Sequence, residues 1–169
     1  MTEQDVRGIV VGERAGVGSQ APDFELPALV AGVKKPLRLS SYRGKNVVLA
    51  FYPYNWQEAS AKELTSFQMA RPSLPGNAEI IAITVDSIMN TTTWEREIGP
   101  FEFPICADFW PHGAVCAQYG VLRESGIDAG ASENALFVID GAGRVVFRKV
   151  YQPEEAFSLD DAISVLEEL

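Results

Sequence analysis

The chain has little cysteine, little histidine and few cations. It has two cysteines, a single histidine and a net charge of −9. Two cysteines make no disulfide framework, which favours a cytoplasmic protein. Such an acidic chain is a poor partner for nucleic acid or an anionic membrane surface, because both attract basic patches.

Long apolar runs are also missing. No run approaches the roughly 20 residues of a membrane span. The first seven residues, MTEQDVR, lack the basic and then apolar pattern of a secretory leader. We therefore expect neither a membrane nor a nucleic-acid partner.

The composition is that of a globular protein. The chain has 169 residues, of which 47% are hydrophobic and 22% charged. These values fit one domain over residues 1–169 with a sizeable core. Residues 1–15 are polar, and we expect them to form a flexible arm.

One strand–loop–helix stretch organises the prediction. Residues 47–51, VVLAF, read as a strand buried on both faces, and Pro53 ends it because proline has no N–H for the ladder. A helix is expected from Ala59 to about Met69. The loop between them lies where a strand ends and a helix begins, and the free N–H groups there create a polar pocket.

The other expected elements alternate between strand and helix. They are an edge strand over 21–27 with a hairpin mate at 36–39, strands at 79–85 and 103–106, a helix capped by Asp86 or Ser87 and ending near Ile98, a short helix over 113–119, a hairpin of 136–140 with 144–148, and a last helix after a near capping box at Ser158. This order predicts an α/β fold, with a central mixed sheet covered by helices on both faces.

Several motifs in this order resemble the peroxiredoxin (AhpC/TSA) family. They are APDF at 21–24, SYRGK at 41–45, FYP at 51–53, VDS at 85–87, FVID at 137–140 and FPICADFWPHG at 103–113. The last run is similar to the one-cysteine, AhpE-like branch. The resemblance implies a thioredoxin-like fold and, for the family, reduction of hydroperoxides by a cysteine thiolate.

The family's reactive residues are replaced in this chain. The family signature is proline, three residues, threonine, two residues and then cysteine. In that frame Pro53 remains, Gln57 stands for the threonine and Ser60 for the cysteine. The family's arginine falls on Asn134. A serine hydroxyl ionises far above neutral pH and forms no sulfenic acid, so the resemblance implies a degenerate active site.

The polar residues of this loop are the candidate site. Tyr54 and Glu58 are able to exchange protons, and Gln57 and Ser60 to hydrogen-bond a carbonyl. The remaining candidates would surround a small ligand: Pro53, Asn55, Trp56 and Asn134. The alternative for each is structural, with Ser60 capping the helix, Glu58 favouring its dipole and Trp56 packing the loop. No base that could activate Ser60 is visible nearby.

Cys106 and Cys116 match no reactive position of the family. Buried structural thiols are one interpretation and a relocated redox thiol is the other. A metal site from Cys106, Asp108, His112 and Cys116 is a third idea, but the spacing matches no zinc pattern. We expect no metal and no cofactor.

Three functional hypotheses remain open. The first is an enzyme repurposed for a non-redox, small-molecule reaction in the former active-site loop, within a biosynthetic pathway. The second is a binding or regulatory pseudo-enzyme, and the third a thiol peroxidase acting through Cys106 or Cys116. The resemblance also implies a homodimer formed through loops near the site, including residues 110–112.

Overall fold

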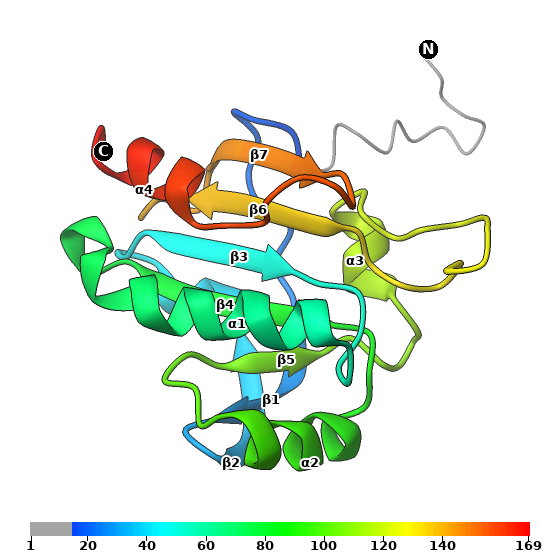
Figure 1. Cartoon of the computed structure of the whole chain (residues 1–169). Helices are drawn as coiled ribbons and strands as arrows, with labels where there is room; N and C mark the ends of the chain where they lie inside the picture. The colour runs from blue at the N-terminus through cyan, green and yellow to red at the C-terminus, as the bar shows by residue number, and fades with distance from the viewer. Residues whose placement is uncertain (1–14) are drawn as a thin grey trace.

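A seven-stranded sheet forms the centre of the protein. The computed structural model describes residues 15–169 (Figure 1). The predicted arm over 1–15 therefore lies outside the described residues, apart from Ala15, which is buried. The strands are β1 (Glu25–Val30), β2 (Val33–Arg38), β3 (Val47–Phe51), β4 (Glu79–Thr84), β5 (Ile105–Ala107), β6 (Asn134–Ile139) and β7 (Val145–Tyr151).

The sheet is mixed, as predicted. Its order is β2-β1-β5-β4-β3-β6-β7. β3 pairs in parallel with β4, which in turn pairs in parallel with β5, and β3 is antiparallel to β6. All five residues of β3 are buried, because helices cover both of its faces. The carboxyl ends of β3, β4 and β5 consequently lie side by side at the same end of the sheet.

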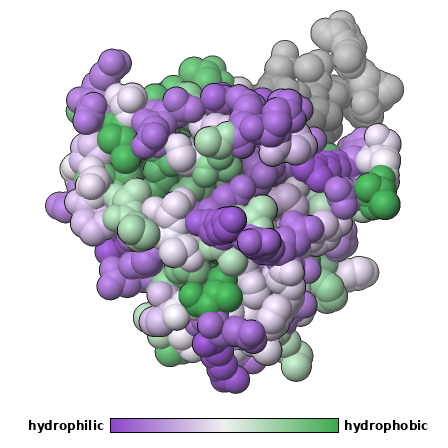
Figure 2. Space-filling model, viewed as in Figure 1, coloured by the Kyte–Doolittle hydropathy of each residue, from purple (hydrophilic) through white to green (hydrophobic). Residues whose placement is uncertain are grey.

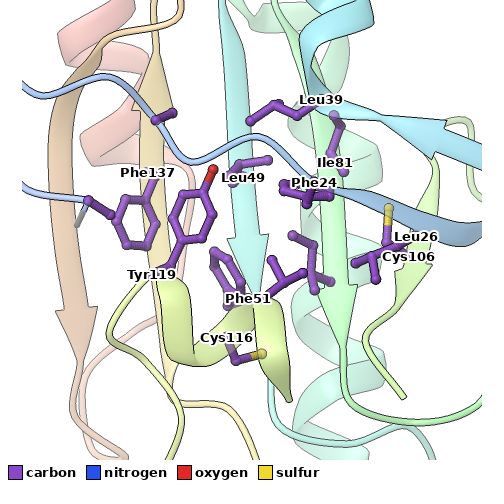
Figure 3. Packing of buried hydrophobic residues seen from close by; sticks show 14 of the residues in the cluster. Phe24, Leu26, Leu39, Leu49, Phe51, Ile81, Cys106, Cys116, Tyr119 and Phe137 are labelled. Atoms are coloured by element: carbon purple, nitrogen blue, oxygen red, sulfur yellow. The ribbon is translucent and has the colours of Figure 1, made fainter. Parts of the chain in front are cut away.

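Helices divide between the two faces. They are α1 (Glu58–Ala70), α2 (Ile88–Ile98), α3 (Ala114–Gln118) and α4 (Asp160–Leu166), with 3₁₀ turns at Leu39–Tyr42, Arg71–Ser73 and Pro75–Asn77. Side chains of α1, α2 and α4 pack in one apolar cluster with β-strand residues such as Leu136 and Val138. α3 packs in the opposite cluster with Phe51 and Phe137 (Figure 3). The predicted α/β sandwich of helices over a mixed sheet is confirmed.

Aromatic packing and a cap fix the two helices nearest the site. Ser87 is the N-cap of α2, and its hydroxyl accepts the N–H of Asn90 at 3.1 Å, as the sequence predicts. Trp94 of α2 is 1% exposed and stacks on Tyr52, with ring centroids 5.9 Å apart. α2 is thereby held against the end of β3.

Several sequence predictions were wrong in detail, including the hairpin mate predicted at 36–39, which is β2 over Val33–Arg38. The first strand is not an edge strand: β1 begins at Glu25 and lies between β2 and β5, and β2 is the edge because the hairpin turns outward. β5 begins at Ile105 rather than 103. Leu159 is the N-cap of α4 and carries no side-chain cap, so the near capping box at Ser158 does not form.

The outer surface is largely polar. On the face shown in Figure 2, hydrophobic groups occur as separate patches among polar ones. The large side chains that remain exposed include Trp56, Met89, Phe109, Trp110 and Ile127. Among residues 15–169, no helix combines the length and apolar character that crossing a bilayer requires.

Candidate functional site

The loop from β3 to α1 lies where β3 ends, α1 begins and β6 starts (Figure 1). Pro53 is buried, and its carbonyl lies 3.5 Å from the hydroxyl of Thr84 on β4. Tyr54 is half-buried. Gln57 is the N-cap of α1 in extended backbone, but its side chain makes no capping hydrogen bond. The first N–H groups of α1 consequently have no side-chain acceptor from the cap.

Asn55 is a structural anchor of this loop. It is 3% exposed, and its Oδ1 accepts the Tyr52 hydroxyl at 2.6 Å. Its Nδ2 donates to Asn90 Oδ1 and Thr91 Oγ1, both at 3.0 Å, and its backbone N–H donates to Asp86 at 2.7 Å. These partners satisfy both ends of the amide, so the structure assigns Asn55 to holding the loop on α2.

Trp56, which was expected beside a ligand, and Glu58, which was expected to exchange protons, are both exposed. Trp56 is 49% exposed, has a positive φ of 65° and donates its Nε1–H to Asn90 at 3.0 Å. Glu58 has 83% of its side chain exposed and lies 3.5 Å from Lys62, one turn along α1. This pair is typical of a solvated helix surface and favours the structural interpretation of Glu58.

Ser60 points inward from the first turn of α1. It is 1% exposed, and its Oγ has no hydrogen-bond partner among the described residues. It shares a helix face with Leu64 and Phe67, which are fully buried. A buried hydroxyl without a partner costs about 1–3 kcal/mol, so this position is unusual for a purely structural serine.

Asn134 Oδ1 is a second buried oxygen that has no hydrogen-bond partner within the described range 15–169. Asn134 begins β6 and pairs with Tyr151, one position beyond the pair of Ala135 with Phe51. Strand alternation places it on the same sheet face as Leu136 and Val138. Those residues pack in the cluster of α1, so Ser60 and Asn134 lie on one face at one end of the sheet.

Glu63 is a further candidate, which the sequence analysis did not name. It lies one turn after Ser60 on the same side of α1, and burial of its carboxylate raises its pKa from 4.5 to about 7. No cation pairs with it among residues 15–169. The three-residue spacing from Ser60 was the available signal.

Both cysteines belong to the core. Cys106 on β5 and Cys116 on α3 are 0% exposed and pack in the cluster that contains Phe51 and Tyr119 (Figure 3). Burial raises the pKa of each thiol, and the nearby Asp108 carboxylate raises it further. Neither environment favours a thiolate near neutral pH, which argues for the structural interpretation.

The residues of the suggested metal site have other partners. Asp108 caps α3, because its two oxygens accept the N–H groups of Val115 at 3.2 Å and Cys116 at 2.8 Å. His112 Nε2 lies 2.7 Å from the carbonyl of Gly130. Within the part of the chain that the structure describes, no three His, Cys, Asp or Glu side chains gather as metal ligands would.

Comparison with known proteins matches residues 17–148 to the AhpC/TSA family. The chain is 37% identical over 144 residues to peroxiredoxin-2 of Bos taurus, covering 81% of this chain and 69% of that protein. It is 36% identical over 141 residues to alkyl hydroperoxide reductase E of Mycobacterium tuberculosis, covering 82% and 88%.

Solved structures share the fold. A reduced 2-Cys peroxiredoxin of Plasmodium vivax superposes with a TM-score of 0.80 at 23% identity, over 89% of this chain and 80% of that one. AhpC of Enterococcus faecalis also gives a TM-score of 0.80, at 22% identity and 90% coverage of both chains. The thioredoxin-like peroxiredoxin fold expected from the motifs is confirmed.

Proposed function

We propose that this chain, which belongs to the AhpC/TSA family, catalyses a non-redox reaction on a small molecule rather than thiol-dependent peroxide reduction. The reaction would use acid–base and hydrogen-bond chemistry at the start of α1 and would serve a biosynthetic pathway. In this proposal Ser60, Gln57 and Asn134 replace the cysteine, threonine and arginine that carry the family's chemistry.

The observation that carries the proposal is the state of Ser60. The Ser60 hydroxyl lies in the first turn of α1, where the family frame places the thiol. It is 1% exposed and has no partner in the part of the chain that the structure describes. Asn134 Oδ1, on the same sheet face, is likewise buried and unsatisfied. Two such atoms at one end of the sheet favour a ligand whose own polar groups complete their hydrogen bonds.

The cysteines supply the complementary support. A peroxidase working through Cys106 or Cys116 would need an accessible thiolate, and both thiols are fully buried with raised pKa values. This geometry disfavours the third hypothesis.

The test is peroxide reduction by the purified protein with excess dithiol. Hydrogen peroxide and an organic hydroperoxide are offered to the wild type, to Ser60→Cys and to the Cys106→Ser, Cys116→Ser double variant. We expect the wild type to match the free-thiol background. Wild-type turnover well above that background, and its loss in the double variant, would overturn the proposal in favour of a relocated thiol.

Ser60→Cys reports separately on the rest of the site. If peroxide reduction by Ser60→Cys also stays at background, we infer that Gln57 and Asn134, in place of threonine and arginine, do not support peroxidase activity. If it becomes an active peroxidase, the surroundings still activate a thiol, and only the nucleophile differs between this chain and the family.

A ligand-binding protein without turnover is the second candidate. It is favoured by Asn55, whose amide is fully engaged in holding the loop, and by Glu58, which is solvated and paired with Lys62. Once a metabolite screen has found a ligand, the two candidates separate clearly. A binding protein returns the ligand unchanged, whereas an enzyme converts it.

We also propose a homodimer through the loops beside the site. The loops after β3 and β5 leave the sheet at the same end. They carry three exposed aromatic residues, whose exposed fractions are 49% for Trp56, 51% for Phe109 and 81% for Trp110. Aromatic side chains of this kind are enriched at interfaces. Sedimentation should show a dimer that Trp110→Glu dissociates, and a monomeric wild type would contradict the assignment.

A further inference from the structure

Ser60 and Glu63 on α1 are a candidate nucleophile and base. They are three positions apart, so they lie on one helix face with Cβ atoms about 5–6 Å apart, and no hydrogen bond joins their side chains in this structure. The Ser-x-x-Lys motif of serine-acylating enzymes uses the same spacing at a helix start. Here the sequence is Ser60-Ala61-Lys62-Glu63, with a carboxylate in the place of that lysine.

We propose that Ser60 and Glu63 form a nucleophile–base pair that accepts an acyl group from a small activated ester or thioester. This inference rests on the proposed non-redox function and specifies its substrate class. It also supplies the base whose absence from the neighbouring sequence made a serine nucleophile unattractive at first.

Ser60 has the environment that a nucleophile at a helix start requires. Its Oγ is committed to no other group among residues 15–169. The N–H groups of the first turn precede the earliest helical hydrogen bond, from Ala61 N–H to the Gln57 carbonyl at 3.1 Å. Those N–H groups, together with the positive end of the helix dipole, would bind the oxyanion that forms when a carbonyl is attacked.

Glu63 has the environment of a general base. Burial alone raises its pKa to about 7, close to the value at which a carboxylate is both deprotonated and basic near neutral pH. Three ionisable groups of neighbouring elements have partners of their own. Tyr52 donates to Asn55, Asp86 accepts the Asn55 N–H, and Lys149 pairs with Asp161. On α1 itself, Lys62 pairs with Glu58.

The chemical step balances within these groups. Ser60 Oγ attacks the acyl carbon while its proton passes to Glu63, and the carbonyl oxygen becomes the oxyanion. When the tetrahedral species collapses, the bond to the alkoxide or thiolate leaving group breaks and the leaving group takes the proton from Glu63. Water or an acceptor alcohol or amine then attacks the acyl-serine while Glu63 accepts its proton. The bond from Ser60 Oγ to the acyl carbon breaks, and Glu63 returns the proton to Ser60 Oγ.

Methanesulfonyl fluoride is a suitable probe, because Ser60 is 1% exposed and a small electrophile reaches it most readily. It transfers its sulfonyl group to a nucleophilic hydroxyl and releases fluoride. Intact mass and peptide mapping give the labelled residue and the labelling rate from pH 5 to 9. Hydrolysis of p-nitrophenyl acetate gives the matching turnover.

We expect single labelling at Ser60, with a rate that rises through about pH 7 as Glu63 loses its proton. Ser60→Ala should not label, and Glu63→Gln should label at least ~100-fold more slowly with the pH rise abolished. Two exposed control positions match these changes: Ser66→Ala on α1 and Glu97→Gln on α2 should both leave the rate unchanged.

Folded wild type that stays unlabelled at Ser60, or a labelling rate that is flat with pH, would overturn the pairing. The wild-type pH profile needs no variant, so misfolding of Glu63→Gln does not obscure the result. The peroxide assay separates the two proposals. Peroxide turnover above background removes the non-redox function itself, whereas an unlabelled Ser60 in a protein silent toward peroxide removes only the acyl-transfer assignment.

Discussion

Replacing Ser60 with alanine should stabilise the protein. The hydroxyl is 1% exposed and without a partner among the described residues, while Leu64 and Phe67 on the same face are fully buried in apolar contacts. A group selected for stability at this position would be apolar. A group kept for binding or chemistry would carry a stability cost, as functional sites commonly do.

The size of the effect follows from two opposing contributions. Removing a buried hydroxyl that makes no hydrogen bond recovers about 1–3 kcal/mol of desolvation free energy. The small void left behind offsets part of this gain in stability, by up to ~1 kcal/mol for a group near methyl size. The net expectation is a gain of about 1 kcal/mol, which raises the melting temperature by roughly 2–4 °C in a chain of this length.

Thermal and urea unfolding followed by circular dichroism measure the effect, with the m-value checked for constancy. Ser66→Ala is the control, because Ser66 is exposed on the same helix and its change should stay within about 0.5 kcal/mol. A loss of more than 1 kcal/mol in Ser60→Ala would refute the reasoning, since it would mean that the Oγ makes a hydrogen bond that stabilises the fold.

Three further predictions concern the surroundings of the site. Burial raises the Glu63 pKa above its unfolded value, so the folded state binds the extra proton between about pH 4.5 and 7 and loses stability as pH rises through that window. Glu63→Gln carries no charge and should therefore gain stability relative to wild type from pH 5 to pH 8. Urea titrations measure this difference, and a difference that stays constant with pH would contradict the reasoning. Asn55→Ala removes the acceptor of the Tyr52 hydroxyl and two side-chain donor bonds, so it should cost about 2–4 kcal/mol in the same titrations, with a cost below 0.5 kcal/mol contradicting the anchor. Cys106 and Cys116 should react with an aromatic disulfide only after unfolding in urea, because both are fully buried; rapid reaction of the native protein would reopen the thiol hypothesis.

The local sequence pattern was sufficient to predict most helices and strands of the fold. The run VVLAF at 47–51 is apolar throughout and became β3, buried on both faces. Ser87 is followed by a periodic segment and became the N-cap of α2. The motifs around these elements also identified the family, which the comparison over residues 17–148 shows.

The errors arose where neighbours in space decide the outcome. Residues 21–27 look like an edge strand because of their prolines, but only the docking of β5 beside β1 makes the strand internal. Ser158 has the composition of a capping box, yet α4 begins at Asp160 and the box does not form. Edge position and cap geometry depend on contacts that the local sequence does not contain.

The properties of the candidate site likewise fall into two groups, those visible in the sequence and those set by packing. Three features are visible in the sequence: a serine near the start of the helix predicted over 59–69, two cysteines in apolar segments, and an uncharged asparagine at position 134. Packing sets two further features: Ser60 Oγ and Asn134 Oδ1 are buried on one sheet face without partners among residues 15–169, and the Asn55 side chain is occupied by Tyr52, Asn90 and Thr91. It also decided the raised pKa of Glu63. The physical reason is that burial, and the partners available to a polar atom, are set by packing between segments far apart in the chain.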